Sequence, residues 1–169
     1  MTASDRILDL AIIGSGIAGL AAAHAARDAG LTCMILDKGR RVGGRVSTKR
    51  AGGFTFNHGA QFLTARAPAF VSATEMAIAQ AALVRWHVAG RDALAGQPTM
   101  RDFPDFLQQG LTVRQQIEIA TIRHDSDSIC LVDQDGETIS ARQVIVTAPA
   151  PQTARLLQTA APDLAALAA

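Results

Sequence analysis

The stretch of sequence that decides the fold is residues 8–37, LDLAIIGSGIAGLAAAHAARDAGLTCMILD. Its first part, Leu8 to Ile13, is a short aliphatic run that ends at a glycine, which is typical of a strand buried on both faces of a parallel sheet. Residues Ile17 to Ala29 then carry small side chains at helical spacing and stop at Gly30, a residue type that commonly caps helices. Leu31 to Leu36 is a second aliphatic run. The stretch therefore predicts a strand, a helix and a second strand parallel to the first, joined by a crossover connection.

The glycines between the first strand and the helix follow the pattern G-x-G-x-x-G, with Gly14, Gly16 and Gly19. In this setting the first glycine permits a tight turn, the second lets the backbone approach a pyrophosphate, and the third lets the helix pack closely on the strand. The phosphates would then lie at the helix N-terminus. Asp37 follows the second strand at about the 20-residue interval at which an acidic side chain binds a ribose. The pattern predicts a dinucleotide-binding domain.

A second glycine pair, in Gly43-Gly44-Arg45, bears on which dinucleotide is bound. It brings another close backbone approach and a guanidinium group toward the same ligand. A nicotinamide-binding domain has no general need of such a group, whereas extended FAD has a pyrophosphate to neutralise. The basic residues of this loop could also form a solvated surface. The pattern favours FAD, and a domain that binds only a nicotinamide dinucleotide is the weaker alternative.

Length and composition limit the other classes of protein. The chain has 169 residues, which fits one domain or slightly more. With 49% hydrophobic and 18% charged residues, it is predicted to fold around an apolar core rather than to be disordered. A net charge of +1 without any block of like charge argues against a nucleic-acid partner. Cys33 and Cys130 lie in apolar runs, are expected to be buried, and are too few for a disulfide framework, which predicts a reducing, cytoplasmic location.

An export signal is the competing interpretation of the N-terminus. Residues 10–26 are uncharged and alanine-rich, and Ala23-His24-Ala25 resembles a cleavage site. However, the preceding segment carries Asp5, Arg6 and Asp9, a net negative charge where export signals are positive. The run is also interrupted by glycines and is too short to span a bilayer. No membrane partner is expected.

The rest of the chain predicts short elements. An ordered, basic, glycine-rich loop is expected over residues 39–53, a strand over 54–60 and a helix over 69–84. Strands are predicted at 117–122, 128–132 and 138–139, where Asp135-Gly136 marks a hairpin turn, so that they form a β-meander. A buried strand at 143–146, a helix at 152–157 and a helical alanine-rich tail follow. Residues 91–110, broken by proline and glycine, are the stretch in which the sequence pattern is least informative.

Two segments carry a family resemblance: residues 37–50, DKGRRVGGRVSTKR, and residues 58–66, HGAQFLTAR. Both resemble the renalase-like branch of the flavin-containing amine oxidase superfamily. The similarity is strong over residues 8–70 and returns over 111–157, where VIVTAP at 144–149 is similar to a later strand of the same domain. The resemblance implies an α/β fold, with a Rossmann-like FAD/NAD(P)-binding domain that has a parallel sheet plus a β-meander, and the beginning of a second, substrate domain.

The domain boundaries that follow from the resemblance divide the chain into four parts. Residues 1–60 and 111–157 would form the FAD-binding domain, 61–110 the start of a substrate domain or cap, and 158–169 a tail. The chain therefore resembles only the N-terminal half of such an enzyme. A strand and a covering helix would be missing, and the exposed apolar surface would be covered by the C-terminal half or by self-association.

The resemblance also implies which residues bind FAD. They are Gly14, Ser15, Gly16, Ala18 and Gly19 at the pyrophosphate; Asp37 at the adenosine ribose, with Lys38 beside it; Gly44 and Arg45 at the phosphate and ribityl region; Gly59, Ala60, Gln61 and Phe62 beside the isoalloxazine ring; and Ile119 at the adenine. No catalytic side chain is identified. No spacing of His, Cys, Asp or Glu predicts a metal site.

Four other side chains are open to more than one interpretation. Asn57 stands where relatives often carry an acid, so tuning of the flavin by this residue is not implied. His58 could be an acid, a base or a covalent flavin anchor, but a histidine beside a glycine turn is more often a hydrogen-bonded structural residue. Trp86 and His87 could line a substrate cavity or cap a helix.

The activity implied by the resemblance is that of an FAD-dependent oxidoreductase. A small-molecule substrate, a reduced nicotinamide or an amine, would transfer a hydride to the flavin, and oxygen would accept the electrons. The alternative is a truncated, catalytically inactive fragment that holds FAD or only its ADP half. Flavin retention and reduction distinguish the two interpretations.

Overall fold

The structure is a computed structural model that describes residues 7–88 and 90–169. By their internal contacts these residues form two compact units. The first unit comprises residues 7–41 and 110–169, and the second unit comprises Val42–Gln109. Each unit is described by itself below.

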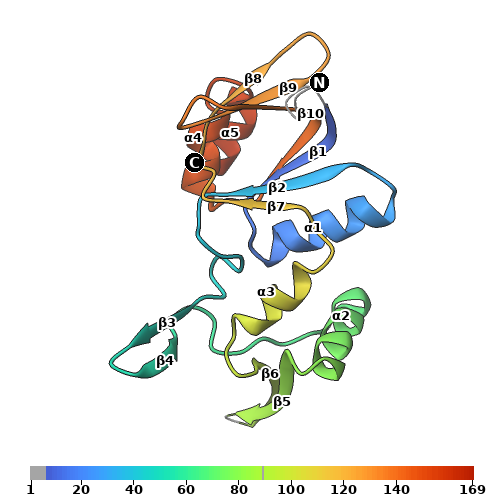
Figure 1. Ribbon diagram of the computed structural model, residues 1–169, viewed down its shortest axis with the longest axis vertical. Helices are drawn as coiled ribbons and strands as arrows, with labels where there is room; N and C mark the ends of the chain where they lie inside the picture. The colour runs from blue at the N-terminus through green and yellow to red at the C-terminus, as the bar shows by residue number, and fades with distance from the viewer. Residues whose placement is uncertain (1–6, 89) are drawn as a thin grey trace. The chain divides into compact units, whose positions relative to one another are not determined.

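The first unit is built on a six-stranded sheet in the order β7-β2-β1-β10-β9-β8 (Figure 1). Its strands are β1 (Leu8–Ile13), β2 (Cys33–Asp37), β7 (Val113–Gln115), β8 (Ile119–His124), β9 (Ile129–Asp133) and β10 (Thr138–Val146). Strands β7, β2, β1 and β10 run parallel to their neighbours, while β10, β9 and β8 form an antiparallel meander. The predicted α/β fold with a parallel sheet and a β-meander is confirmed.

Strand β10 belongs to both parts of the sheet. Thr138–Ala141 pair antiparallel with β9, and Ala141–Val146 pair in parallel with β1. The sequence pattern predicts two separate strands, at 138–139 and 143–146, and this division is wrong. The intervening residues 140–142, Ser-Ala-Arg, contain neither glycine nor proline, so the chain continues as one nine-residue strand.

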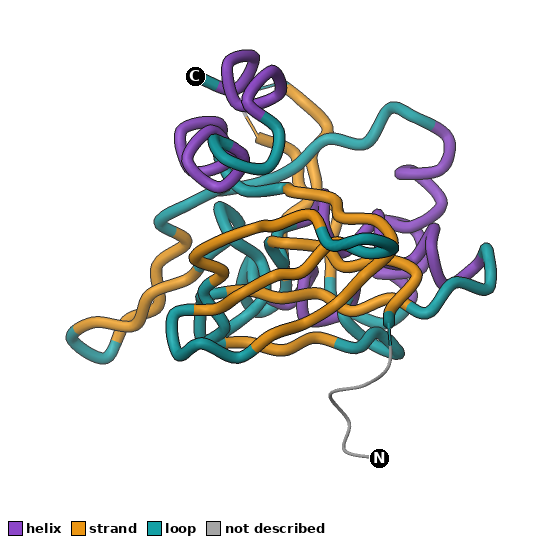
Figure 2. Tube along the Cα trace, turned by 90° about the horizontal axis from the view of Figure 1, so that it is seen from above, coloured by secondary structure: helices purple, strands orange, loops and turns teal. Residues whose placement is uncertain are grey.

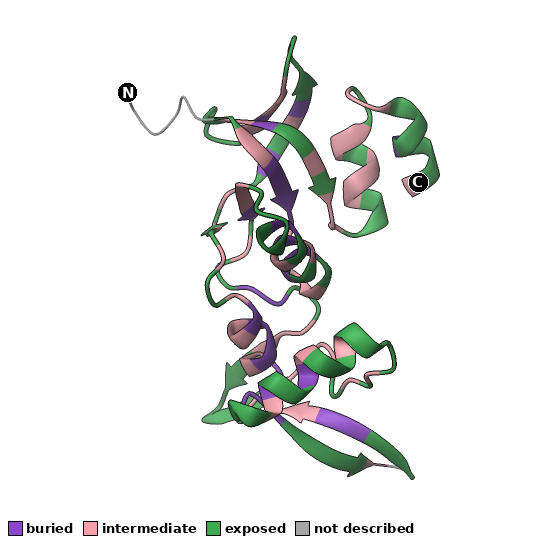
Figure 3. Cartoon of the chain, turned by 90° about the vertical axis from the view of Figure 1, so that its right-hand side faces the viewer, coloured by how far each residue is buried: buried purple, intermediate pink, exposed green. Residues whose placement is uncertain are grey.

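Helices cover both faces of this sheet (Figure 1, Figure 2). Helix α1 (Ile17–Asp28) packs on β1 and β2 through small buried residues, among them Gly19 and Ala23, and ends before Gly30, whose φ of 76° confirms the predicted cap. Helices α4 (Ala150–Leu157) and α5 (Pro162–Ala168) lie side by side. Leu156 and Leu157 pack against the core cluster formed by Ala11, Ile13, Leu36, Ile119, Ile122, Leu131 and Ala141. Within this unit, buried residues lie on the central strands β1 and β2 and on α1 (Figure 3).

The second unit contains a β-hairpin that the sequence analysis did not predict in full. Strands β3 (Thr48–Ala51) and β4 (Phe54–Asn57) pair antiparallel. Residues 39–53 were expected to form a loop, and this was wrong for Thr48–Ala51. Gly52 and Gly53 both have positive φ, 57° and 78°, which is the backbone of the tight turns that join twisted antiparallel strands.

The remaining elements of the second unit are α2 (Pro68–Ala79), β5 (Leu83–Val88), β6 (Arg91–Gly96) and α3 (Asp102–Leu107). The predicted helix at 69–84 therefore ends early. Ala81 takes a left-handed φ of 58°, and the β-branched and aromatic run from Leu83 onward pairs with β6 instead. Trp86 and His87 consequently lie on a strand, and the interpretation that they cap a helix was wrong.

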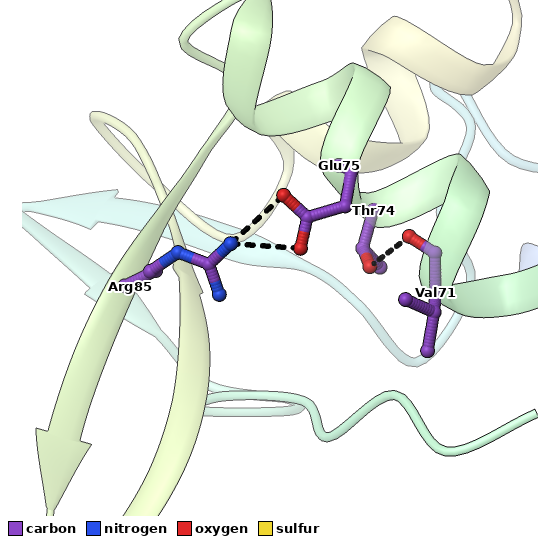
Figure 4. Close-up of polar contacts among 4 residues, drawn as sticks. All are labelled: Val71, Thr74, Glu75 and Arg85. Atoms are coloured by element: carbon purple, nitrogen blue, oxygen red, sulfur yellow. Dashed lines mark hydrogen bonds and ion pairs between the residues drawn. The ribbon is translucent and has the colours of Figure 1, made fainter.

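An ion pair joins α2 to β5 (Figure 4). Arg85 Nη2 lies 2.8 Å from both carboxylate oxygens of Glu75, and the Thr74 hydroxyl donates to the Val71 carbonyl oxygen within α2. Both charged side chains are exposed. Such a pair contributes less than about 1 kcal/mol to stability.

Candidate functional site

The glycine turn follows β1 at the carboxyl end of the parallel strands. Gly14 has a φ of 107°, a conformation that favours glycine, and its N–H donates to the Leu36 carbonyl oxygen at 2.8 Å. The turn therefore lies beside the end of β2, where Asp37 follows Leu36. Ligands of open α/β sheets bind at this end of the strands.

The other two glycines of the pattern have different surroundings. A Cβ placed on Gly19 would lie 1.9 Å from the Gly14 carbonyl oxygen, so only glycine allows α1 to approach the turn this closely. A Cβ placed on Gly16 would meet no atom within 4 Å. Gly16 therefore faces open space at the N-terminus of α1, and the exposed Ala18 follows in the first turn.

Ser15 lies between Gly14 and Gly16 and is completely buried. Its N–H donates to Asp37 Oδ2 at 2.5 Å, whereas its hydroxyl oxygen has no hydrogen-bond partner among the described residues. No side chain caps the N-terminus of α1. A phosphate group fits this arrangement, because free helix N–H groups and an unpartnered hydroxyl supply donors and the helix dipole favours negative charge.

The carboxylate of Asp37 is held by backbone groups on both sides. Besides the Ser15 N–H, it accepts the Gly39 N–H at 2.6 Å through Oδ1. Each carboxylate oxygen retains a further lone pair, so the side chain can also accept bonds from ribose hydroxyls. Lys38 lies next to it, exposed, with Nζ 3.4 Å from Glu118 Oε1.

The segment after Asp37 is joined to the segment before β8. The Asp37 carbonyl oxygen accepts the Ile117 N–H and the Gly39 carbonyl oxygen accepts the Gln116 N–H, each at 3.0 Å. Ile119, the first residue of β8, is buried. The predicted residues Gly14 to Gly19, Asp37, Lys38 and Ile119 thus lie on adjoining segments of the first unit.

The second predicted group lies in the second unit. Gly43 and Gly44 have φ values of 115° and 53°, and the Val46 N–H donates to the Gly43 carbonyl oxygen at 2.9 Å, which closes a turn around the exposed Arg45. The Arg45 carbonyl oxygen accepts the Ala60 N–H at 3.0 Å. A Cβ on Gly59 would lie 1.9 Å from that same oxygen. The two segments that carry the family resemblance therefore pack directly on each other.

The side chains that follow Ala60 are partly exposed. Gln61 Nε2 donates to the Asn57 carbonyl oxygen and, at 3.4 Å, to that of Gly59. Phe62 and Trp86 are 37% and 42% exposed, and their rings meet edge to face with centroids 6.1 Å apart. This aromatic pair leaves apolar ring surface exposed on the second unit.

Asn57 and His58 have protein partners. Asn57 Oδ1 accepts the Thr48 hydroxyl at 3.0 Å and the Met100 N–H at 3.1 Å, so this side chain joins β3 to the segment before α3. His58 Nε2 lies 3.2 Å from Ser47 Oγ. The hydrogen-bonded interpretation of His58 agrees with this geometry.

Thr147 is a site residue that the sequence analysis missed. It follows β10, and its hydroxyl donates to the carbonyl oxygens of Ile13 and Gly14, each at 3.1 Å. The sequence signal was the threonine in VIVTAP, directly after an aliphatic strand. Nothing in the local pattern links that residue to a glycine turn more than a hundred positions earlier.

Other parts of the chain lie apart from this arrangement. A cavity of about 640 Å³ in the first unit is lined by residues at the amino ends of β1, β2 and β10, including Leu8, Cys33 and Thr138, at the opposite end of the strands from the glycine turn. Cys33 and Cys130 are free and have intermediate exposure, so the expectation of buried thiols was wrong. Among residues 7–88 and 90–169, no helix is both long and apolar enough to cross a membrane.

Two protein-family models match this chain. Residues 12–73 match the model of the NAD(P)-binding Rossmann-like domain. Residues 69–169, more than half of the chain, match the model of flavin containing amine oxidoreductases. The chain belongs to the flavin-containing amine oxidoreductase family. FAD is therefore the cofactor that the family assignment supports.

Two individual proteins are similar in sequence to about a third of this chain. Polyamine oxidase 3 of Oryza sativa subsp. japonica is 44% identical over 52 residues, which are 31% of this chain and 11% of the rice protein. "Possible lysine-specific histone demethylase 1" of Drosophila melanogaster is 42% identical over 53 residues, 31% of this chain and 6% of the fly protein.

A solved structure of putrescine oxidase, a double mutant with redesigned cofactor binding, has the same fold. It superimposes with a TM-score of 0.71 at 14% sequence identity, over 88% of this chain and 60% of the putrescine oxidase chain. The chain thus spans less than two thirds of the length of the relatives it matches.

Proposed function

We propose that this chain holds FAD for an oxidoreductase of the renalase and amine oxidase kind, which transfers a hydride from a reduced nicotinamide-type or amine substrate to the flavin and uses oxygen as the acceptor. The observation that carries this proposal is the glycine turn before α1. Gly16 faces open space there, and the buried Ser15 hydroxyl has no partner among the described residues.

The residues of the first unit would bind the adenosine diphosphate half. Gly14 and Ser15 would form the turn around the pyrophosphate, and the backbone N–H groups from Gly16 to Gly19, at the N-terminus of α1, would donate to it. Asp37 would accept the ribose hydroxyls, and Lys38 and Ile119 would lie along the adenosine. No acidic residue occupies the first turn of α1, so no side chain of that turn repels a phosphate. The binding of the pyrophosphate would thus depend on backbone dipoles rather than on a charged side chain.

The residues of the second unit would bind the flavin half. Gly44 and Arg45 would approach the phosphate and ribityl region, and residues 59–62 would pass beside the isoalloxazine ring. The packing of Gly59 and Ala60 on the Arg45 backbone supports a shared role for these two segments. When bound, FAD supplies the redox chemistry, and the protein orients it and the substrate.

The two substrate classes rest on different findings. The names of the rice relative and of the putrescine oxidase structure support an amine, whereas the resemblance of residues 37–66 to the renalase-like branch supports a reduced nicotinamide. Residues 61–110 would begin the substrate domain, and the exposed Phe62–Trp86 pair offers an apolar surface there for a substrate. The predicted cytoplasmic location stays a prediction.

The test begins with the purified chain incubated with FAD and freed of unbound flavin. We expect a retained flavin absorbance that bleaches under anaerobic conditions on addition of reduced nicotinamide dinucleotide or of putrescine, and the compound that bleaches it identifies the substrate class. Protein that stays colourless after incubation contradicts the proposal. Retained FAD that neither compound reduces supports a binding fragment without turnover.

A Gly16→Leu variant provides the control for the location of the phosphates. A leucine side chain would fill the open space at the N-terminus of α1 without meeting protein atoms at its Cβ. We expect this variant to retain no flavin. Retention equal to that of the unmodified protein would show that the pyrophosphate does not bind at this turn.

A further inference from the structure

The peptide unit between Gly14 and Ser15 is held from both sides. Its carbonyl oxygen, on Gly14, accepts a hydrogen bond from the Thr147 hydroxyl at 3.1 Å. Its N–H, on Ser15, donates to Asp37 Oδ2 at 2.5 Å. In a trans peptide these two groups point in opposite directions, so the two side chains restrain the same plane from opposite edges.

The two restraining residues come from the strands on either side of β1. Asp37 ends β2 and Thr147 directly follows β10, and both strands pair in parallel with β1. The Thr147 N–H continues the pairing by donating to the Ile13 carbonyl oxygen at 2.8 Å. This bond fixes the backbone of Thr147, so its hydroxyl reaches the glycine turn from a defined position.

The Thr147 hydroxyl carries a single proton and two acceptors lie within reach. The Ile13 and Gly14 carbonyl oxygens are each 3.1 Å from Oγ1. Ile13 already accepts the Thr147 backbone N–H. The hydroxyl therefore contributes about one hydrogen bond. Because the Thr147 backbone already bonds to Ile13, the bond that only the hydroxyl can supply is the one to Gly14.

A restraint on this peptide unit has a physical reason. Gly14 has a φ of 107°, and a glycine in this region can rotate its peptide plane without the steric penalty that a side chain imposes. Rotation by half a turn would direct the Gly14 carbonyl oxygen toward the Asp37 carboxylate and the Ser15 N–H away from it. That arrangement would place two oxygen dipoles together next to the space in front of α1, where it would repel an anion.

We propose that Thr147 is a positioning residue for the dinucleotide phosphates. Together with Asp37 it keeps the Gly14–Ser15 peptide in the orientation that leaves the turn open to an anion. This proposal rests on the proposed function, because the phosphates it concerns are those of FAD. Without the hydroxyl, part of the protein would hold the turn in other orientations, and the apparent affinity for FAD would fall in proportion.

The test compares three variants with the unmodified chain. Thr147→Val keeps the shape of the side chain and removes the hydroxyl, while Thr147→Ser keeps the hydroxyl and removes the methyl group. Thr153→Val is the matched control, since the Thr153 hydroxyl also donates to a backbone carbonyl, that of Ala148 at 2.9 Å, which is not a carbonyl of the glycine turn. The two readouts are the FAD dissociation constant by fluorescence titration and the amide exchange rate of Ser15 in FAD-free protein by NMR.

We expect Thr147→Val to raise both the FAD dissociation constant and the Ser15 exchange rate by about 3- to 10-fold, the worth of one neutral hydrogen bond. Thr147→Ser and Thr153→Val should match the unmodified protein in both. If Thr147→Val leaves both quantities unchanged, or if Thr147→Ser changes them as much, the proposal is overturned. If Thr147→Val does not fold, the comparison falls on Thr147→Ser. A Ser15 exchange rate equal to that of the unmodified protein then supports the proposal, and a faster rate overturns it.

Failure of the proposed function gives a separate result. An unmodified chain that binds no FAD would contradict the proposed function, while the Ser15 exchange rates would still show whether Thr147 restrains the turn.

Discussion

The close approach of α1 to the glycine turn predicts that Gly19→Ala destabilises the protein even without a cofactor. An added Cβ would lie 1.9 Å from the Gly14 carbonyl oxygen, and 3.1 Å from both the Gly14 carbonyl carbon and Thr147 Oγ1. Ordinary contact begins at 3.4 Å, so the helix and the turn would have to separate by about 1.5 Å. The nearest atom belongs to the backbone, so no side-chain rotation relieves the overlap.

The size of the effect follows from three contributions. Overpacking of this kind costs about 1–3 kcal/mol. Displacing the Gly14 carbonyl group also weakens its hydrogen bond to Thr147, a loss of about 1 kcal/mol. Alanine favours a helix over glycine by about 1 kcal/mol, which offsets part of the cost. With central values, we expect the free energy of unfolding to fall by about 2 kcal/mol, equivalent to a melting temperature lower by about 4–8 °C.

The assay is urea unfolding of FAD-free protein followed by far-ultraviolet circular dichroism, with Gly16→Ala as the matched control. Gly16 has a φ of −68° and no atom within 4 Å of an added Cβ, so alanine fits there. We expect Gly16→Ala to leave the stability unchanged or to raise it by up to about 1 kcal/mol, while FAD affinity falls at least tenfold. Equal stability of Gly19→Ala and unmodified protein, or equal destabilisation by both variants, would refute the reasoning.

Three further predictions concern other positions. Gly59→Ala should lower the free energy of unfolding by about 1–3 kcal/mol, because its Cβ would lie 1.9 Å from the Arg45 carbonyl oxygen; denaturation curves measure this, and an unchanged midpoint would contradict it. Burial raises the pKa of the Cys33 thiol above its ordinary value of 9.0, so less thiolate is present at a given pH. Alkylation of Cys33, followed by mass spectrometry, should therefore reach its half-maximal rate at a higher pH in folded protein than in urea; coincident profiles would argue against it. Glu75→Gln should change the stability by less than about 1 kcal/mol, because the ion pair with Arg85 is exposed, and a larger loss would mean that the pair is shielded from solvent.

The sequence by itself determined the parts of the fold that depend on neighbouring residues. Residues 8–37 predicted β1, α1 and β2 to within about two residues. Buried strands and a helix can be recognised from the spacing of apolar residues along the chain and from the glycines at their ends. The glycine turn and Asp37 were found in the same way, since the residues that build the turn lie within thirty positions of one another. The meander was likewise visible in short aliphatic runs and the Asp135-Gly136 turn.

The tertiary structure decided where local preference was weak or overridden. Thr48–Ala51 have the composition of a basic loop, yet they pair with β4 because Gly52 and Gly53 allow a tight turn. The helix predicted over 69–84 included Leu83 and Val84, yet residues 83–88 form β5 because β6 offers a partner for their backbone. Propensity differences of under about 1 kcal/mol per residue are smaller than the gain from such pairing and packing.

The candidate site divides along the same line. The glycines and Asp37 could be predicted from their spacing, whereas Thr147, 133 residues from Gly14, could not. A hydrogen bond between segments so far apart in the chain produces no recognisable sequence pattern. The same holds for the packing of Gly59 on Arg45. Local sequence thus specified which backbone can bind a phosphate, and the pairing of β1 with its two neighbouring strands determined which side chains hold that backbone in place.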